Sequence, residues 1–183
     1  MFSHRIDDRV ELRLLEERHA EELFSLLEQN RNHLRAELTW LNEEFSLKDA
    51  KEYVRAGLER FAAGNGLRAG IWLQDSLAGI VSLHNLIQVD RKASLGYWLG
   101  ASFQGQGLVT MACSVLINHS FSELKLNRLE IQCAPANDRS RRVAERLGFT
   151  QEGVLRQSWW IQGQFVDQVV YGLLASEWQA KTS

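Results

Sequence analysis

The stretch that decides how this chain folds reads Gln104-Gly105-Gln106-Gly107-Leu108-Val109-Thr110, and it connects a β-like segment to an apolar helix. Glycines before a helix let the backbone approach a ligand, because they lack a Cβ and accept positive φ. The helix start offers unpaired N–H groups at the positive end of its dipole, which suits a phosphate oxygen. The same glycines would also serve as a plain turn, so the stretch alone leaves both interpretations open.

Other phosphate-binding loops fit this stretch poorly. The dinucleotide fingerprint needs a third glycine where this chain has Thr110, and no Gly-Lys-[Ser/Thr] triplet follows. A dinucleotide or ATP loop is therefore disfavoured.

The segments on either side of the glycines indicate a strand–helix–strand unit. Ala93–Gly100 is rich in β-forming residues, and Leu129–Cys133 alternates apolar with polar residues. Apolar residues at helical spacing lie between them: Val109, Cys113, Leu116, Ile117, Phe121 and Leu124. A crossover through a helix predicts that the two strands are parallel.

The rest of the chain completes a mixed sheet. Leu67–Gln74 and Leu77–Gln88 are expected to form an antiparallel meander with Ala93–Gly100. Further strands are expected at Val10–Leu15, Gly153–Ile161 and Phe165–Leu174, and further helices at Ala20–Leu27, Leu34–Leu41, Lys48–Ala63 and Ser140–Leu147. The predicted fold class is α/β (α+β), with a mostly antiparallel sheet of about seven strands, about four helices and one domain over residues 1–183.

Size and composition disfavour several classes of function. The chain has 183 residues, of which 45% are hydrophobic, and a formal net charge of -2. Acidic and basic residues are interleaved, so neither nucleic acid nor a membrane is an expected partner. The charged N-terminus does not fit a signal peptide, and no apolar run approaches the roughly 20 residues that span a bilayer, so a cytoplasmic location is expected. Scattered histidines and two cysteines, Cys113 and Cys133, predict no metal site and reduced core thiols.

Three motifs in sequence order carry a family resemblance. They are Gly96-Tyr97-Trp98-Leu99, then Gln104-Gly105-Gln106-Gly107, then Asn137-x-x-Ser140 continuing into Arg146-Leu147-Gly148-Phe149. Together they resemble the GNAT N-acetyltransferase superfamily, and most closely the branch that acetylates the N-termini of ribosomal proteins. The resemblance covers nearly the whole chain and implies that Gly96–Gly100 splays apart from Leu129–Ala134.

The resemblance implies acetyl-CoA as co-substrate, with its pyrophosphate on the glycine stretch and its pantetheine arm in the gap between the splayed strands. The implied coenzyme-binding residues are Trp98, Leu99, Gln104, Gly105, Gln106, Gly107, Leu108, Val109, Thr110, Asn137, Ser140 and Arg142. Val109 stands where the family pattern has Gly or Ala, which a backbone contact tolerates if the side chain packs into the core. Arg142 belongs to a basic cluster with Arg139, Arg141 and Arg146 that suits the 3′-phosphate or, alternatively, forms a solvated helix face.

The resemblance also implies direct attack of an amine on the thioester. Ser140 is expected to donate a hydrogen bond to the departing thiolate, and the N–H of Leu99 to hold the oxyanion. Asn137 and Ser140 also suit the first turn of a helix as capping residues. Ser140→Ala is therefore expected to lower kcat with little effect on coenzyme binding.

The general base is not identified by the motifs. Ser94 and Trp159 stand where relatives carry acidic residues. Glu130 on the neighbouring strand is one candidate, and Glu37 or Glu43 acting through a water are others. Each of these also suits a surface carboxylate.

Aromatic residues mark the expected acceptor groove, namely Trp40, Tyr97 and Trp159. Because neighbouring strand residues point to opposite faces, Trp159 and Trp160 cannot both be buried on one side. One of them is expected to face the groove or a partner subunit, and a homodimer is a possible assembly.

Three functions fit these observations. The first is transfer of acetyl to a protein N-terminal α-amine of the ribosomal-protein type. The second keeps the chemistry but takes a small amine, such as a polyamine, amino acid or aminoglycoside. The third is a non-catalytic sensor that binds coenzyme A, which the missing acids at Ser94 and Trp159 motivate and the retained Asn137 and Ser140 oppose.

Overall fold

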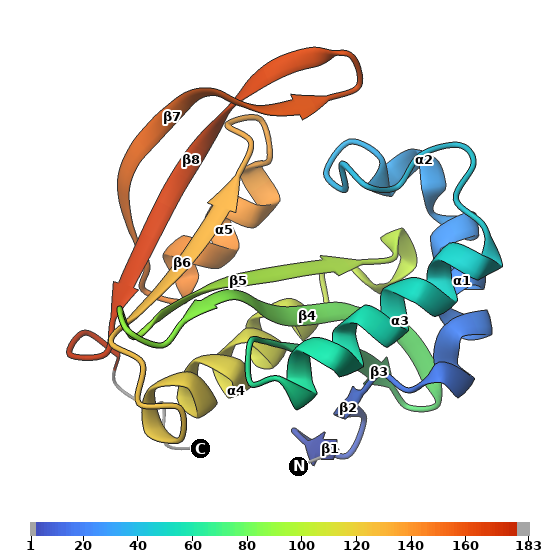
Figure 1. Cartoon of the computed structure of the whole chain (residues 1–183), viewed down its shortest axis with the longest axis horizontal. Coiled ribbons are helices and arrows are strands. Elements are labelled where there is room, and N and C mark those ends of the chain that lie inside the picture. Colours follow the sequence, from blue (N-terminus) through green and yellow to red (C-terminus); the bar gives the residue numbers. More distant parts are fainter. Residues whose placement is uncertain (1–2, 179–183) are drawn as a thin grey trace.

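The computed structural model describes residues 3–178, which build one eight-stranded sheet (Figure 1). In spatial order the strands are β1 (Ser3–Arg5), β2 (Val10–Leu14), β3 (Leu67–Leu73), β4 (Ser76–Ile87), β5 (Lys92–Leu99), β6 (Arg128–Cys133), β8 (Gln164–Leu174) and β7 (Thr150–Ile161). Neighbouring strands are antiparallel except β5 and β6, which are parallel. The predicted mixed sheet, its meander and its parallel pair are confirmed.

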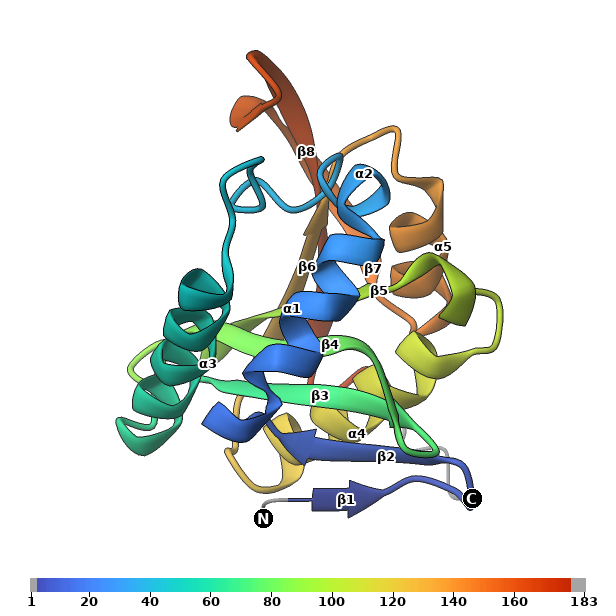
Figure 2. The same ribbon diagram turned by 90° about the vertical axis from the view of Figure 1, so that its right-hand side faces the viewer.

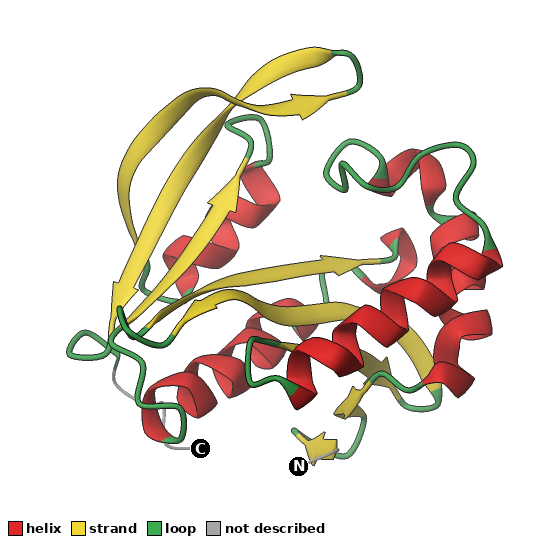
Figure 3. Cartoon of the chain, in the orientation of Figure 1, coloured by secondary structure: helices red, strands yellow, loops and turns green. Residues whose placement is uncertain are grey.

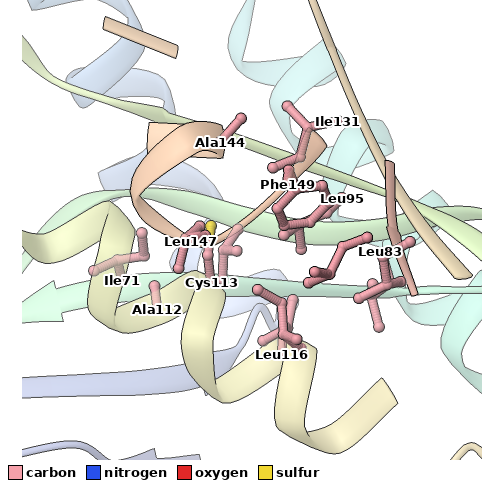
Figure 4. Close-up of a cluster of buried hydrophobic side chains, with 14 of the residues drawn as sticks. Ile71, Leu83, Leu95, Ala112, Cys113, Leu116, Ile131, Ala144, Leu147 and Phe149 are labelled. Atoms are coloured by element: carbon pink, nitrogen blue, oxygen red, sulfur yellow. The ribbon is translucent and has the colours of Figure 1, made fainter. Parts of the chain in front are cut away.

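Helices cover both faces of the sheet (Figure 2). On one face lie α1 (Ala20–Gln29) and α3 (Leu47–Ala62), and on the other lie α4 (Leu108–Ser122) and α5 (Asp138–Arg146). Each face has its own buried core, and Figure 4 shows the one beneath α4 and α5. Fully burying one of its leucines contributes roughly 1.5–3 kcal/mol, so these contacts fix both helices against the sheet.

The parallel pair separates soon after it forms. Its register is Lys92 with Arg128, Ala93 with Leu129 and Ser94 with Glu130. Within the described residues no pairing between these strands continues beyond Ser94, and β6 diverges from β5 in Figure 1. This divergence confirms the predicted splay and leaves one edge of β5 open.

The connection between α1 and α3 differs from the prediction (Figure 3). The leucine spacing predicts a helix over Leu34–Leu41, but α2 spans only Arg31–Leu34 and turns follow it. Leu34 and Leu41 are buried all the same. The guanidinium of Arg31 donates to the carbonyl of Phe45 at 3.0 Å and to another loop carbonyl, which satisfies acceptors that an irregular segment leaves free.

Two smaller differences concern the N-terminal half. Strand β1 adds an eighth strand, and three residues are too few to show a period-two pattern. The buried face of α3 also includes a glycine, because Gly57 takes a buried position while Leu58 is only partly buried. The start of α3 follows its sequence signal, since Ser46 and Asp49 form a capping box.

None of the helices among residues 3–178 has the length and apolar character required to cross a bilayer.

Candidate active site

Two chambers meet where β5 and β6 separate. One, of about 790 Å³, extends along residues 104–110 and α5, and we call it the glycine-loop chamber. The other, of about 830 Å³, extends along α3 and the neighbouring parts of β3, β4 and β5, and we call it the α3 chamber. Both are lined by Glu37, Leu38, Tyr97, Trp98, Gln132, Ser140 and Trp159. These shared residues form the junction between the chambers.

The glycine stretch supplies the floor of the glycine-loop chamber. Gly105 and Gly107 have φ of 77° and 78°, a left-handed conformation that side chains rarely adopt. Gly107 is the N-cap of α4, and no side chain caps the helix start. The first N–H groups of α4 are therefore available to a ligand anion. Gln106 is exposed and does not line this chamber, unlike the other six residues of the stretch.

Three arginines of α5 form a basic wall of the glycine-loop chamber: Arg139, Arg142 and Arg146. Arg139 donates to the side-chain oxygen of Gln104, and Arg146 Nη1 lies 3.4 Å from Thr110 Oγ1. Arg141 points elsewhere. Its Nε donates to the hydroxyl of Tyr171 at 3.2 Å, because position 141 lies on a different side of the helix from positions 139, 142 and 146.

The start of α5 places a serine at the junction. Asn137 Oδ1 accepts a hydrogen bond from Ser140 N at 3.0 Å, so the capping role is present. Ser140 Oγ lies 2.9 Å from Tyr97 Oη of β5, which spans the splay. Burial raises the pKa of Tyr97 above its usual value of 10.0, so the phenol is neutral at physiological pH. A neutral phenol can donate to Ser140 while the serine hydroxyl donates to a ligand.

The backbone of β5 offers a donor to the same gap. Gly100 N donates to Ala78 O of β4 at 2.9 Å. Because successive N–H groups of a strand point to opposite edges, the N–H of Leu99 points away from β4. That edge faces the splay, where Trp98 and Leu99 line the glycine-loop chamber.

The candidate acidic residues differ in whether they line a chamber. Glu130 Oε1 accepts from Arg128 Nε at 2.9 Å, and Glu130 lines neither chamber. Glu43 is paired with Arg35 at 2.9 Å. Among the residues that the structure describes, Glu37 is the only carboxylate that lines either chamber, and it lines both. The geometry therefore favours Glu37 over Glu130 and Glu43 as a proton acceptor.

The expected aromatic groove residues all line the α3 chamber. Trp40 packs against Tyr53 with ring centroids 4.7 Å apart, and Trp159 lies at the junction. Trp160, with 57% of its surface exposed, packs against the ring of Phe165 instead. The two adjacent tryptophans thus point to different sides of β7, as the strand periodicity requires.

Both cysteines are buried and free, and burial raises the pKa of each thiol. Cys113 lies in the core beneath α4. Cys133 also borders the glycine-loop chamber, a position that its strand alternation alone does not reveal. With a raised pKa neither thiol is a ready nucleophile.

Several residues that line the chambers belong to no local sequence motif. Leu38 and Gln132 lie at the junction, and Arg60, Arg68 and His84 line the α3 chamber. The only signal for Gln132 is the alternation of β6, which places it on the face opposite Ile131. Arg60, Arg68 and His84 become neighbours because α3 packs on β3, which pairs with β4.

The chain resembles known proteins over most of its length. Residues 9–150 match the acetyltransferase (GNAT) domain. The chain is 40% identical to the putative ribosomal N-acetyltransferase YdaF of Bacillus subtilis (strain 168), over 99% of this chain and 100% of that protein. It is 30% identical to the ribosomal-protein-serine acetyltransferase of Escherichia coli (strain K12), over 91% and 93%. A solved structure of RimL, a ribosomal L7/L12 alpha-N-protein acetyltransferase in complex with coenzyme A, superimposes with a TM-score of 0.89 at 28% identity, over 93% and 96% of the two chains.

The chain belongs to the GNAT acetyltransferase family, as the motifs predict. It is an acetyltransferase of the branch whose members are named ribosomal-protein N-acetyltransferases.

Proposed function

We propose that this enzyme transfers acetyl from acetyl-CoA to the α-amine of a protein N-terminus, of the kind found on ribosomal proteins. The observation that carries this proposal is the junction, where the Tyr97–Ser140 pair and Glu37 lie between two chambers. One chamber is built for an anionic donor and the other is open to an acceptor. The names of two relatives, a ribosomal-protein-serine acetyltransferase and the alpha-N-protein acetyltransferase RimL, support a protein α-amine as acceptor.

The donor fits the glycine-loop chamber from one end to the other. The pyrophosphate of acetyl-CoA accepts hydrogen bonds from the first N–H groups of α4, residues 108–110, next to Gly107. The arginines of α5 that line the chamber, including Arg142, take the 3′-phosphate. The pantetheine arm occupies the splay beside Trp98 and Leu99, like an added strand. The RimL relative, which binds coenzyme A, supports this arrangement.

The core-facing side chain of Val109 is compatible with a backbone contact to the pyrophosphate. Val109 is partly buried and packs against the core beneath α4. Its departure from the Gly or Ala of the family pattern therefore leaves the helix start open.

The reaction follows from the groups at the junction. Glu37, through a water, takes a proton from the ammonium group of the acceptor, and the neutral nitrogen attacks the thioester carbonyl carbon. The N–H of Leu99 stabilises the oxyanion while the C–N bond forms. The C–S bond then breaks, and the proton that the nitrogen loses on becoming an amide passes to the departing thiolate through Ser140, whose own oxygen is held by Tyr97. The products are the acetylated amine and coenzyme A.

Turnover on defined peptides tests this function. Acetyl-CoA is incubated with the enzyme and peptides that begin with Ser or Ala, and coenzyme A release and peptide mass are measured. We expect one acetyl group per free N-terminus and none on a peptide whose N-terminus is blocked.

Other outcomes separate the alternatives. Acetylation of small amines alone would replace the protein acceptor with a small one. Binding of acetyl-CoA without transfer to any amine would support the sensor. Failure to bind coenzyme A would contradict the donor site.

A further inference from the structure

The α3 chamber has a basic wall away from the junction. It is formed by Arg60 of α3, Arg68 of β3 and His84 of β4. These three residues line only the α3 chamber, whereas Glu37 lines both chambers. The acid and the basic wall are therefore separated along the path that an acceptor would follow.

Contacts with Tyr53 hold the side chain of Arg68 in place on this wall. Its guanidinium carbon lies 3.5 Å from the centroid of the Tyr53 ring, and Nη1 donates to the Tyr53 carbonyl. A Cβ added at Gly57 would lie 3.3 Å from Arg68 Nη1, tighter than most side-chain contacts. Glycine is unfavourable inside a helix, so its presence in the middle of α3 is explained by the room that it gives Arg68.

A second glycine makes room for His84 in the same way. A Cβ added at Gly96 of β5 would lie 3.0 Å from His84 Cε1. Burial of this imidazole beside Arg60 and Arg68 lowers its pKa below 6.5, so it is neutral at physiological pH. His84 therefore adds a hydrogen-bonding group to the wall, and the positive charge comes from the two arginines.

Neither Arg60 nor Arg68 is neutralised by a carboxylate of the described part of the chain. Within residues 3–178 no carboxylate lies within ion-pairing distance of Arg60 or Arg68. Arg68 is half-buried, and buried charges in folded proteins are ordinarily paired. Two unpaired guanidinium groups in one cavity make a binding surface for an anion, because guanidinium matches a carboxylate in shape and charge.

We propose that Arg60, Arg68 and His84 form an anion subsite that selects acceptors with a carboxylate close behind the reacting amine. This inference rests on the proposed function and gives the acceptor a chemical class, an N-terminal segment with Asp or Glu shortly after its first residue. A polycationic amine is a poor acceptor for the same reason, because the arginines repel it.

Matched peptides test the subsite. Peptide pairs that begin with Ser and differ only by Glu or Gln at the second, third or fourth residue are compared by kcat/KM. For the best position we expect the Glu peptide to be favoured by about tenfold, which is the usual worth of one charge-assisted hydrogen bond. In Arg60→Gln the ratio of kcat/KM for the Glu peptide to kcat/KM for the Gln peptide falls to about two or less. In Arg60→Glu a Lys peptide has a higher kcat/KM than the Glu peptide.

Arg55→Gln is the matched control, because Arg55 is an exposed arginine of the same helix that lies outside both chambers. It leaves the ratio unchanged. Arg60 is itself exposed, so its variants are expected to fold, which a melting curve verifies. Arg68→Lys adds a second test, since it keeps the charge but loses the stacked, planar contact with Tyr53.

The outcomes distinguish this inference from the proposed function. Acetylation of all peptides with equal kcat/KM, or a Glu preference that survives in Arg60→Gln, would overturn the subsite and leave the function intact. If no peptide reacts, the same comparison is made with glutamate against glutamine as small acceptors. A preference for glutamate that Arg60→Gln removes would support the subsite with a different acceptor, and no preference would refute it.

Discussion

The two chambers of this enzyme are built by different means. The glycine-loop chamber uses a helix start, a short glycine stretch and one side of α5, and these elements carry recognisable sequence motifs. The α3 chamber uses side chains from α3, β3, β4, β5 and β7 that lie far apart in the sequence. A site formed by the backbone is set by the fold, whereas a site formed by scattered side chains changes with single substitutions. We therefore expect single substitutions to change the acceptor side more readily than the donor side.

A single substitution at the junction should give the largest effect, which is expected on kcat. Glu37→Gln removes the only described carboxylate of either chamber, so we expect kcat to fall by about 100-fold or more, as for loss of a general base. Steady-state kinetics measures this. Glu44→Gln in the same loop is the control and should keep full activity, since Glu44 lines neither chamber. Equal loss in both variants would mean that the loop, not the carboxylate, matters.

A substitution in the glycine stretch should give the next largest effect, and this effect should fall on the Kd for acetyl-CoA alone. Gly107→Ala puts a side chain at φ 78° and displaces the helix start, so we expect the Kd for acetyl-CoA to rise by about 30-fold. Calorimetry measures the Kd. Gly64→Ala carries the same strain at φ 68° outside both chambers, so it should lose similar stability, about 1 kcal/mol, with an unchanged Kd. A matching loss of affinity in Gly64→Ala would show that strain, not ligand contact, is measured.

Ser140 should give a smaller effect that falls on kcat. Ser140→Ala removes the donor to the thiolate, so we expect kcat to fall by about tenfold, the worth of one hydrogen bond, while the coenzyme Kd stays within about twofold. Tyr97→Phe should cost less, because Ser140 remains. The raised pKa of Tyr97 keeps its hydroxyl protonated up to and beyond pH 10, so wild-type activity should not fall from pH 8 to 10 through this group. Unchanged turnover in Ser140→Ala would remove the serine from the mechanism.

The arginines of α5 should give the smallest effect. Arg142→Gln is expected to raise the coenzyme Kd by about fivefold, and less at high salt because an exposed ion pair is screened. Arg141→Gln is the paired control, since Arg141 bonds to Tyr171 outside the chamber. Equal effects of the two substitutions would assign the contribution to overall charge and not to the position on the helix.

The two chambers also differ in how much of each could be predicted from the sequence. The glycine stretch lies within one short motif, and Asn137 and Ser140 lie within another, so these residues can be proposed as site residues before any fold is known. The separation of Arg141 from Arg139, Arg142 and Arg146 also follows from helical periodicity, and the sequence interpretation missed it by treating the cluster as one group. The mixed sheet with its parallel pair was predictable from period-two and helical patterns.

The acceptor side was less predictable because it depends on tertiary packing. Glu37 reaches the junction from an irregular connection whose path is set by buried leucines and by Arg31, and no local pattern specifies that path. Glu130 is a different case, because Arg128 lies two residues before it on the same face of β6 and the period of the strand alone brings their side chains together. Arg68 and Gly57 become partners only when α3 packs on β3.

The early separation of β5 from β6 has a consequence for hydrogen exchange. The N–H of Gly100 is bonded to Ala78, whereas the adjacent N–H of Leu99 faces the open edge of β5. In the empty enzyme Leu99 should therefore exchange its amide hydrogen for deuterium much faster than Gly100 does. A pantetheine arm lying along that edge would slow Leu99 alone, so the difference between two neighbouring amides would report how much of the enzyme carries coenzyme.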